Sequence, residues 1–99
     1  MNEICTINIE GKDCSLEFQI KKCYLYSYSH YFRSFIEKDQ NLTEFAYSNT
    51  SFGEKIYTLY FSEFHAKNIP KFQITSDINE NDLEELLQLN EILQSEIIL

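Results

Sequence analysis

The stretch FQIKKCYLYSYSHYFRSF, residues 18–35, decides the fold because the period of its apolar residues changes within it. Phe18 and Ile20 alternate with polar residues, which is typical of a half-buried strand. From residue 22 onward, large apolar side chains instead recur at helical spacing, at Leu25, Tyr28, Phe32, Phe35 and Ile36. The stretch therefore predicts a strand that leads directly into helix.

Part of the same stretch also fits the pattern of a strand. Three tyrosines alternate as they would in a strand, namely Tyr24, Tyr26 and Tyr28. The length of the segment and its lack of Gly and Pro favour helix, and the hydroxyl of Ser29 is suited to capping a second helix. We therefore predict two short helices, roughly residues 22–28 and 30–37.

Upstream of this stretch, the alternation extends to the start of the chain. Cys5, Ile7 and Ile9 share one face of residues 4–10, as expected for a half-buried strand. Gly11 then supplies a turn, and the alternation resumes at Leu16, Phe18 and Ile20. The first twenty residues are thus predicted to form a β-hairpin.

Downstream, the pattern predicts a strand, a helix, a further strand and a final helix. Leu42, Phe45 and Tyr47 are spaced like a short strand. Ser51 and Glu54 form a predicted capping box for a helix that ends before residues 68–70, because Pro70 cannot continue it, and a strand follows at 72–75. Asn79 caps the last helix, whose apolar stripe consists of Leu83, Leu86, Leu87, Asn90, Leu93 and Ile97. This stripe either continues to its end or breaks near residue 95.

The predicted fold is therefore α+β, in the order β-β-α-α-β-α-β-α(-α). A short mixed sheet would be flanked by a cluster of about five helices. The chain has 99 residues, of which 43% are hydrophobic and 24% charged, so residues 1–99 should form a single folded domain.

Charge and hydropathy exclude several classes of partner. The net charge of −8 argues against nucleic acid and anionic lipid surfaces, and no apolar run of about 18 residues predicts a membrane span. No signal peptide is recognisable, so we expect a cytoplasmic or nuclear protein. Residues 77–99 contain seven acids and no Lys or Arg, so a basic partner should meet the last helix.

Catalytic signals are sparse. The chain has only two glycines, so it lacks a phosphate-binding loop and a dinucleotide fingerprint, and we expect neither cofactor nor enzyme activity. The three cysteines are spaced nine residues apart, which does not suit a zinc site, and their odd number indicates free thiols. The alternative is a small enzyme of unknown type that uses Cys23 with His30 or His65.

Residues 18–35 also resemble the signature of the BTB/POZ domain, in which a strand ending in Phe-x-Val-His-Lys leads to Leu, then Ser, then Tyr-Phe. The matching positions are Phe18, Ile20, Lys22, Leu25, Ser29, Tyr31 and Phe32. Residues 6–11 are similar to the first strand and turn of the family, and residues 82–94 to its late leucine-rich helix. Departures from the pattern are Lys21 in place of histidine, Ile4 in place of aspartate, and Asn90 in place of a small residue.

The resemblance implies a eukaryotic protein-interaction or assembly module without catalytic residues. Members of this family homodimerise, form larger homo-oligomers or recruit cullin ubiquitin ligases as adaptors. Because the chain starts at the first strand, it looks closer to the short elongin C-like or channel-tetramerisation type than to members with a swapped N-terminal segment.

Candidate partner-binding residues follow from two observations. Tyrosines with an apolar body and a polar tip suit an interface, which points to Tyr24, Tyr26, Tyr28 and Tyr31. Phe61 and Glu63 resemble the hydrophobic-x-Glu motif of cullin-binding members. The competing interpretation makes Phe61 a core or surface aromatic and Glu63 an exposed carboxylate.

Overall fold

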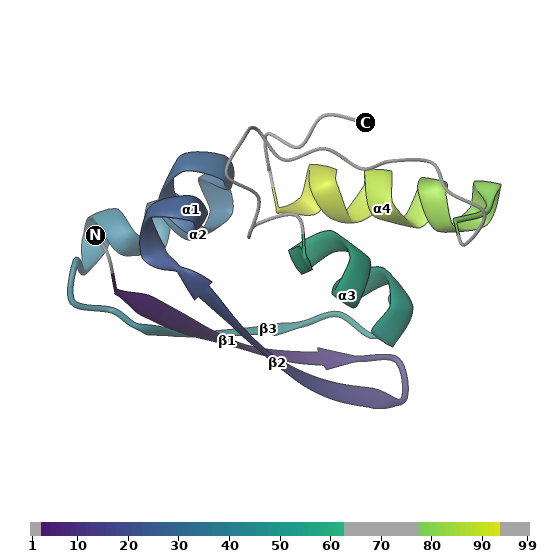
Figure 1. Cartoon of the computed structure of the whole chain (residues 1–99), viewed down its shortest axis with the longest axis horizontal. Coiled ribbons are helices and arrows are strands. Elements are labelled where there is room, and N and C mark those ends of the chain that lie inside the picture. The colour runs from purple at the N-terminus through teal and green to yellow at the C-terminus, as the bar shows by residue number, and fades with distance from the viewer. Residues whose placement is uncertain (1–2, 63–77, 94–99) are drawn as a thin grey trace.

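The structure, a computed structural model, describes residues 3–62 and 78–93. These residues form a small mixed α+β fold with a three-stranded sheet and four helices (Figure 1). The elements are β1 (Ile4–Gly11), β2 (Cys14–Lys21), α1 (Lys22–Tyr28), α2 (His30–Lys38), β3 (Glu44–Ser48), α3 (Glu54–Ser62) and α4 (Glu80–Ile92). The predicted strand at 72–75 and any fifth helix beyond residue 93 lie outside the described residues.

The sheet has the order β2-β1-β3, with β1 antiparallel to β2 and parallel to β3. Ile7 in the central strand pairs with Phe18 on one side and Phe45 on the other. Alternation along β1 places Cys5, Ile7 and Ile9 on the buried face. The four helices all lie over this face, so the described part of the fold has two layers (Figure 1).

The hairpin is confirmed, but the role predicted for Gly11 is wrong. Gly11 is the last residue of β1, has no positive φ and pairs with Cys14. Asp13 instead adopts the left-handed conformation, with φ 56°, which aspartate tolerates better than most residues. Glycine is required at position 11 because a Cβ there would lie 2.8 Å from the Phe52 carbonyl oxygen and from the Tyr57 ring.

Two short helices follow β2, as predicted, and they are separated at Ser29. This residue is extended, with φ −133° and ψ 115°, and its Oγ accepts a hydrogen bond from the Phe32 N–H at 3.3 Å. The same hydroxyl donates to the Leu93 carbonyl at 2.9 Å. The break between α1 and α2 therefore also anchors the C-terminal end of α4.

The predicted start of the third helix is wrong. Ser51 lies in a turn, where its N–H donates to Asn49 Oδ1, and α3 begins only at Glu54. The Gly53 carbonyl accepts the first helical hydrogen bond, from the Tyr57 N–H at 3.2 Å. Phe52 does not belong to the first turn of α3. Its side chain is buried in the core, where its ring packs against that of Tyr57.

The last helix begins as predicted but presents a different face. Asn79 caps α4 in a reciprocal capping box with Asp82. Its buried residues are Leu86, Leu89 and Leu93, whereas Leu87, expected in the stripe, is 46% exposed. Leu86, Leu89 and Leu93 form a narrow stripe at spacings of three and four, and Leu87 lies about 100° away from Leu86 around the helix.

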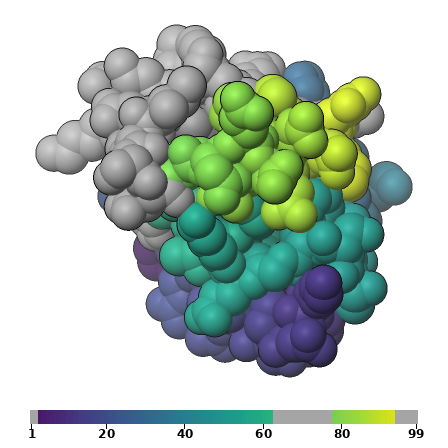
Figure 2. All heavy atoms as spheres, turned by 90° about the vertical axis from the view of Figure 1, so that its right-hand side faces the viewer, coloured from purple at the N-terminus to yellow at the C-terminus, as the bar shows by residue number. Residues whose placement is uncertain are grey.

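Figure 2 shows the stacking that this stripe produces. α4 lies on α3, and α3 lies on the β1–β2 hairpin. Between the two helices, the Lys55 ammonium forms an ion pair with Asp82 Oδ2 at 2.6 Å. Asn90 Oδ1 is buried and accepts no hydrogen bond within the described part of the chain. The oxygen of the amide that the sequence places on an apolar stripe is thus without a donor there.

Candidate functional site

The four tyrosines predicted to bind a partner do not form one surface. Tyr24 and Tyr28, one turn apart on α1, stack with ring centroids 6.1 Å apart. Tyr26 lies on another side of α1, where its hydroxyl donates to Glu37 Oε1 at 3.0 Å. Tyr31 packs against Phe35 of α2 and Tyr47 of β3. All four tyrosines are partly buried, and they cover three separate places.

Phe61 is fully buried. Its ring centroid lies 5.0 Å from that of Phe18 of β2, 6.3 Å from that of Phe32 of α2 and 5.2 Å from that of Tyr60 on its own helix, so it joins α3 to the sheet and to α2. Contact between this side chain and a cullin would require the core to open. Glu63, the other residue of the predicted motif, lies outside the described residues.

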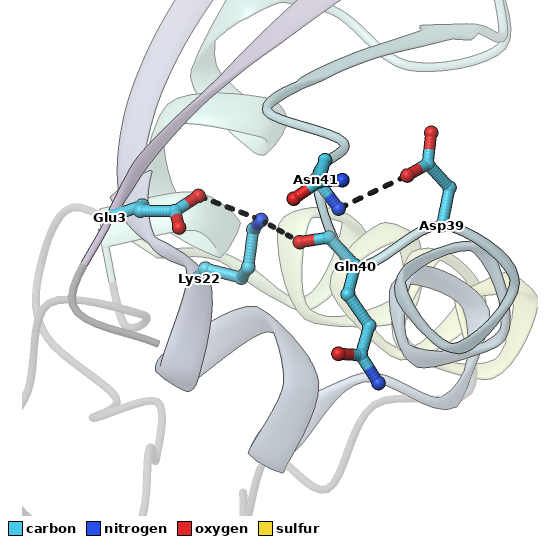
Figure 3. Close-up of polar contacts among 5 residues, drawn as sticks. All are labelled: Glu3, Lys22, Asp39, Gln40 and Asn41. Carbon is cyan, nitrogen blue, oxygen red and sulfur yellow. Dashed lines mark hydrogen bonds and ion pairs between the residues drawn. The ribbon is translucent and has the colours of Figure 1, made fainter.

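A different group of residues lines a hollow that contains several polar groups. It has a volume of about 300 Å³ and lies between the start of β1, the helices α1 and α2, and the turn before β3 (Figure 3). Its lining consists of Glu3, Lys22, Tyr26, Ile36, Glu37, Gln40 and Asn41. We call it the Lys22 hollow.

Lys22 forms the base of this hollow and is only 1% exposed. Its ammonium donates to Glu3 Oε2 at 2.9 Å and to the Gln40 carbonyl at 2.7 Å (Figure 3). A buried charge is costly unless it is paired and hydrogen-bonded, and the first turn of a helix disfavours a cation. These two bonds compensate for that cost, so Lys22 connects three segments that are distant in sequence.

The surrounding groups position the two acceptors. The Lys22 backbone N–H donates to the Glu3 carbonyl at 2.8 Å, which holds the start of β1 beside α1. The Asn41 N–H donates to Asp39 Oδ1 at 3.0 Å and closes the turn that presents the Gln40 carbonyl. The first contact joins residues that are distant in sequence and the second lies within one turn, and both use a backbone N–H, so the backbone positions both acceptors.

The carboxylates of the hollow differ in their partners. Glu3 is 57% exposed at its side chain, and the hydrogen bond and charge of Lys22 hold its carboxyl pKa below the ordinary value. Glu37 accepts the Tyr26 hydroxyl, and this bond together with the negative charge raises the pKa of the Tyr26 phenol. Each carboxylate therefore has one oxygen committed to a neighbour.

Sequence reasoning missed most of this hollow. Lys22 appeared only as a matching position of the resemblance, and Glu3, Glu37, Gln40 and Asn41 carried no recognisable spacing. The one available signal was a pair of lysines at the junction of strand and helix. Alternation alone does not say which of Lys21 and Lys22 faces inward, because the period changes between them.

Residues 3–62 and 78–93 form neither an activated-thiol site nor a metal site. Burial raises the pKa of the Cys5 thiol, which keeps it protonated at neutral pH. Cys23 is partly exposed but makes no hydrogen bond to His30 among these residues, and His65 lies outside them. No group of three or more His, Cys, Asp or Glu side chains within the same ranges could hold a metal ion. The thiol-enzyme alternative stays a hypothesis.

The chain matches no family model, no curated protein and no solved structure. Among the described helices, none has the length and apolar character that a membrane crossing needs. The geometry of the described residues is therefore the basis for the proposals that follow.

Proposed function

We propose that this domain is a non-enzymatic protein-interaction module that associates with itself or docks a protein partner. The observation that carries the proposal is the exposure of large apolar side chains beside an already filled core. Ile4 is 50% and Phe35 38% exposed, and on α4 Leu87 is 46% and Ile92 45% exposed. Exposed apolar side chains that cluster are typical of surfaces that meet another protein.

The end of the molecule that carries α1 and α2 is the favoured surface. Phe35 belongs to α2 at this end, beside the N-terminus, whereas Ile4 at the start of β1 alternates with Cys5 and lies on the sheet face away from the helices (Figure 1). The partly buried rings of Tyr31 and Tyr47 extend the aromatic surface from Phe35 to the edge strand β3. Tyrosine and phenylalanine are enriched at the centres of protein interfaces, which supports this choice.

We further propose a BTB/POZ-like module of the short, elongin C-like type. Support comes from the match at residues 18–35, from the strand-strand-helix-helix-strand-helix order of the first six elements, and from the cap at Ser29. An adaptor role toward a cullin is the more specific form of this proposal. Because Phe61 is buried, such docking would depend on other residues of α3 or on Glu63.

Size-exclusion chromatography with light scattering tests self-association from low to high micromolar concentration. We expect the apparent mass to rise with concentration, and Phe35→Ser to reduce the rise. Leu87→Ser is the matched control, since this leucine is similarly exposed but lies on α4. A strict monomer at every concentration would contradict self-association. An equal effect of both variants would show that the α1–α2 surface is not the site of self-association.

A further inference from the structure

The Lys22 hollow has an unbalanced negative charge. Lys22 is neutralised by Glu3, and the remaining charged group of the lining is Glu37, which is exposed. Within the described residues, Glu37 makes no ion pair. Arg33 lies one turn before it on α2, but its Nε donates to the Tyr26 carbonyl and its Nη2 to the Ser27 carbonyl. The lining as a whole therefore carries a net negative charge.

Both carboxylates also retain an acceptor. Glu3 uses Oε2 for the Lys22 ammonium, and Glu37 uses Oε1 for the Tyr26 hydroxyl. Among the described residues, the second oxygen of each accepts no hydrogen bond. Since both residues line the same hollow, each offers an acceptor to a ligand that carries several N–H donors.

The apolar part of the lining suits the stem of a long side chain. Ile36 contributes an aliphatic surface and Tyr26 an aromatic one. The volume of about 300 Å³ is at the lower limit of ordinary small-molecule sites, which favours a single side chain over a drug-sized ligand. A carboxylate or phosphate would meet two acids at the mouth of the hollow, so anions are disfavoured.

We propose that the Lys22 hollow binds the guanidinium of an arginine side chain supplied by a protein partner. The planar guanidinium has five N–H donors in a fixed fork and forms paired bonds to carboxylates, whereas the lysine ammonium is a compact point charge. Its methylene stem lies along Ile36 and Tyr26. This inference rests on the proposed interaction function and specifies the chemistry of the partner.

A titration with N-acetyl-arginine amide, followed by backbone amide NMR shifts, tests the inference without a known partner. We expect saturable shifts at Glu37, Gln40 and Asn41. Glu37→Gln keeps an acceptor for Tyr26 but removes the charge, and it should weaken binding by about threefold to tenfold. Glu84→Gln removes an equal charge from the exposed side of α4 and should change binding by less than about twofold.

N-acetyl-lysine amide and N-acetyl-glutamate amide serve as competing probes. The proposal is overturned if arginine amide produces the same shifts in wild type and Glu37→Gln, or if the lysine or glutamate probe binds as tightly. Unchanged amide dispersion in Glu37→Gln verifies that the variant is folded. A strictly monomeric protein would still bind the arginine probe, so failure of the hollow and failure of self-association give different results.

Discussion

At Gly11, a hydrogen atom in place of a methyl group determines how closely the hairpin approaches the start of α3. The Lys12 N–H donates to the Phe52 carbonyl at 2.8 Å, and a Cβ at position 11 would occupy the same narrow space. Two of its three nearest atoms belong to the backbone of Phe52 and the buried ring of Tyr57. Neither can move without displacing the core.

We predict that Gly11→Ala lowers the free energy of unfolding by about 1–3 kcal/mol, as overpacking does in other cores. Urea denaturation followed by circular dichroism measures the change. Gly53→Ala is the matched control, because its Cβ would meet no atom within 4 Å. Its stability should stay within about 1 kcal/mol of wild type, since lower chain entropy and a poorer N-cap act in opposite directions. Equal losses in the two variants would contradict the steric explanation.

At the scale of elements, Ser29 holds three helices together. Its hydroxyl caps α2 and donates to the Leu93 carbonyl, which also accepts the Tyr31 N–H at 3.3 Å. A helix does not satisfy its last carbonyls internally, and these two bonds from Ser29 and Tyr31 supply the Leu93 carbonyl with donors. A residue predicted only as a cap is therefore also a tertiary contact.

Ser29→Ala should cost about 1–3 kcal/mol of stability, from the lost cap and the lost hydrogen bond to the Leu93 carbonyl, which then keeps only the longer bond from the Tyr31 N–H. Hydrogen exchange should show faster exchange in α2 and in the last turn of α4. Ser34→Ala provides the comparison, since the Ser34 hydroxyl is exposed and bonds only to Tyr31 of its own helix. We expect that variant to remain within about 0.5 kcal/mol of wild type. An Ser29→Ala protein with unchanged exchange at α4 would refute the tertiary role.

At the scale of the whole molecule, two ion pairs join distant segments and make stability depend on pH. Lys22 lowers the pKa of the Glu3 carboxyl, and Lys55, with the Asn79 backbone, lowers that of Asp82. A carboxyl with a lowered folded-state pKa contributes stability above its unfolded pKa and loses it as the pH falls through the folded value. The ordinary values are 4.5 for Glu3 and 3.8 for Asp82, so the loss begins near these values and continues below them.

We therefore predict that the free energy of unfolding falls as the pH decreases below about 4.5, the ordinary value for Glu3. Asp82→Asn should make the free energy of unfolding fall less steeply as the pH decreases. The amide retains an acceptor for the cap but does not titrate. Denaturation midpoints measured across the acid range provide the test. Glu84→Gln, which changes an exposed carboxylate without an ion partner among the described residues, should leave the slope as it is. A slope unaltered by Asp82→Asn would show that other groups dominate.

The local elements of this fold were largely predictable because each has its own period and cap. The alternation of Cys5, Ile7 and Ile9 and the helical spacing that begins after Ile20 depend only on neighbours in sequence. The caps at Ser29 and Asn79 are likewise short-range. The α+β class and the hairpin followed from these signals.

The face of each helix and the membership of the hollow were decided by tertiary packing. Leu87 and Leu89 are equally apolar, but Leu89 is buried in the core whereas Leu87 is 46% exposed. Helix periodicity places Tyr26 on a different side of α1 from Tyr24 and Tyr28, but only packing brings its hydroxyl to Glu37. The Lys22 hollow joins the start of β1 to the turn before β3 through one ammonium. The sequence determines local periods and caps, whereas such long-range pairing exists only after the chain has folded, because it depends on distance in space and not on spacing in sequence.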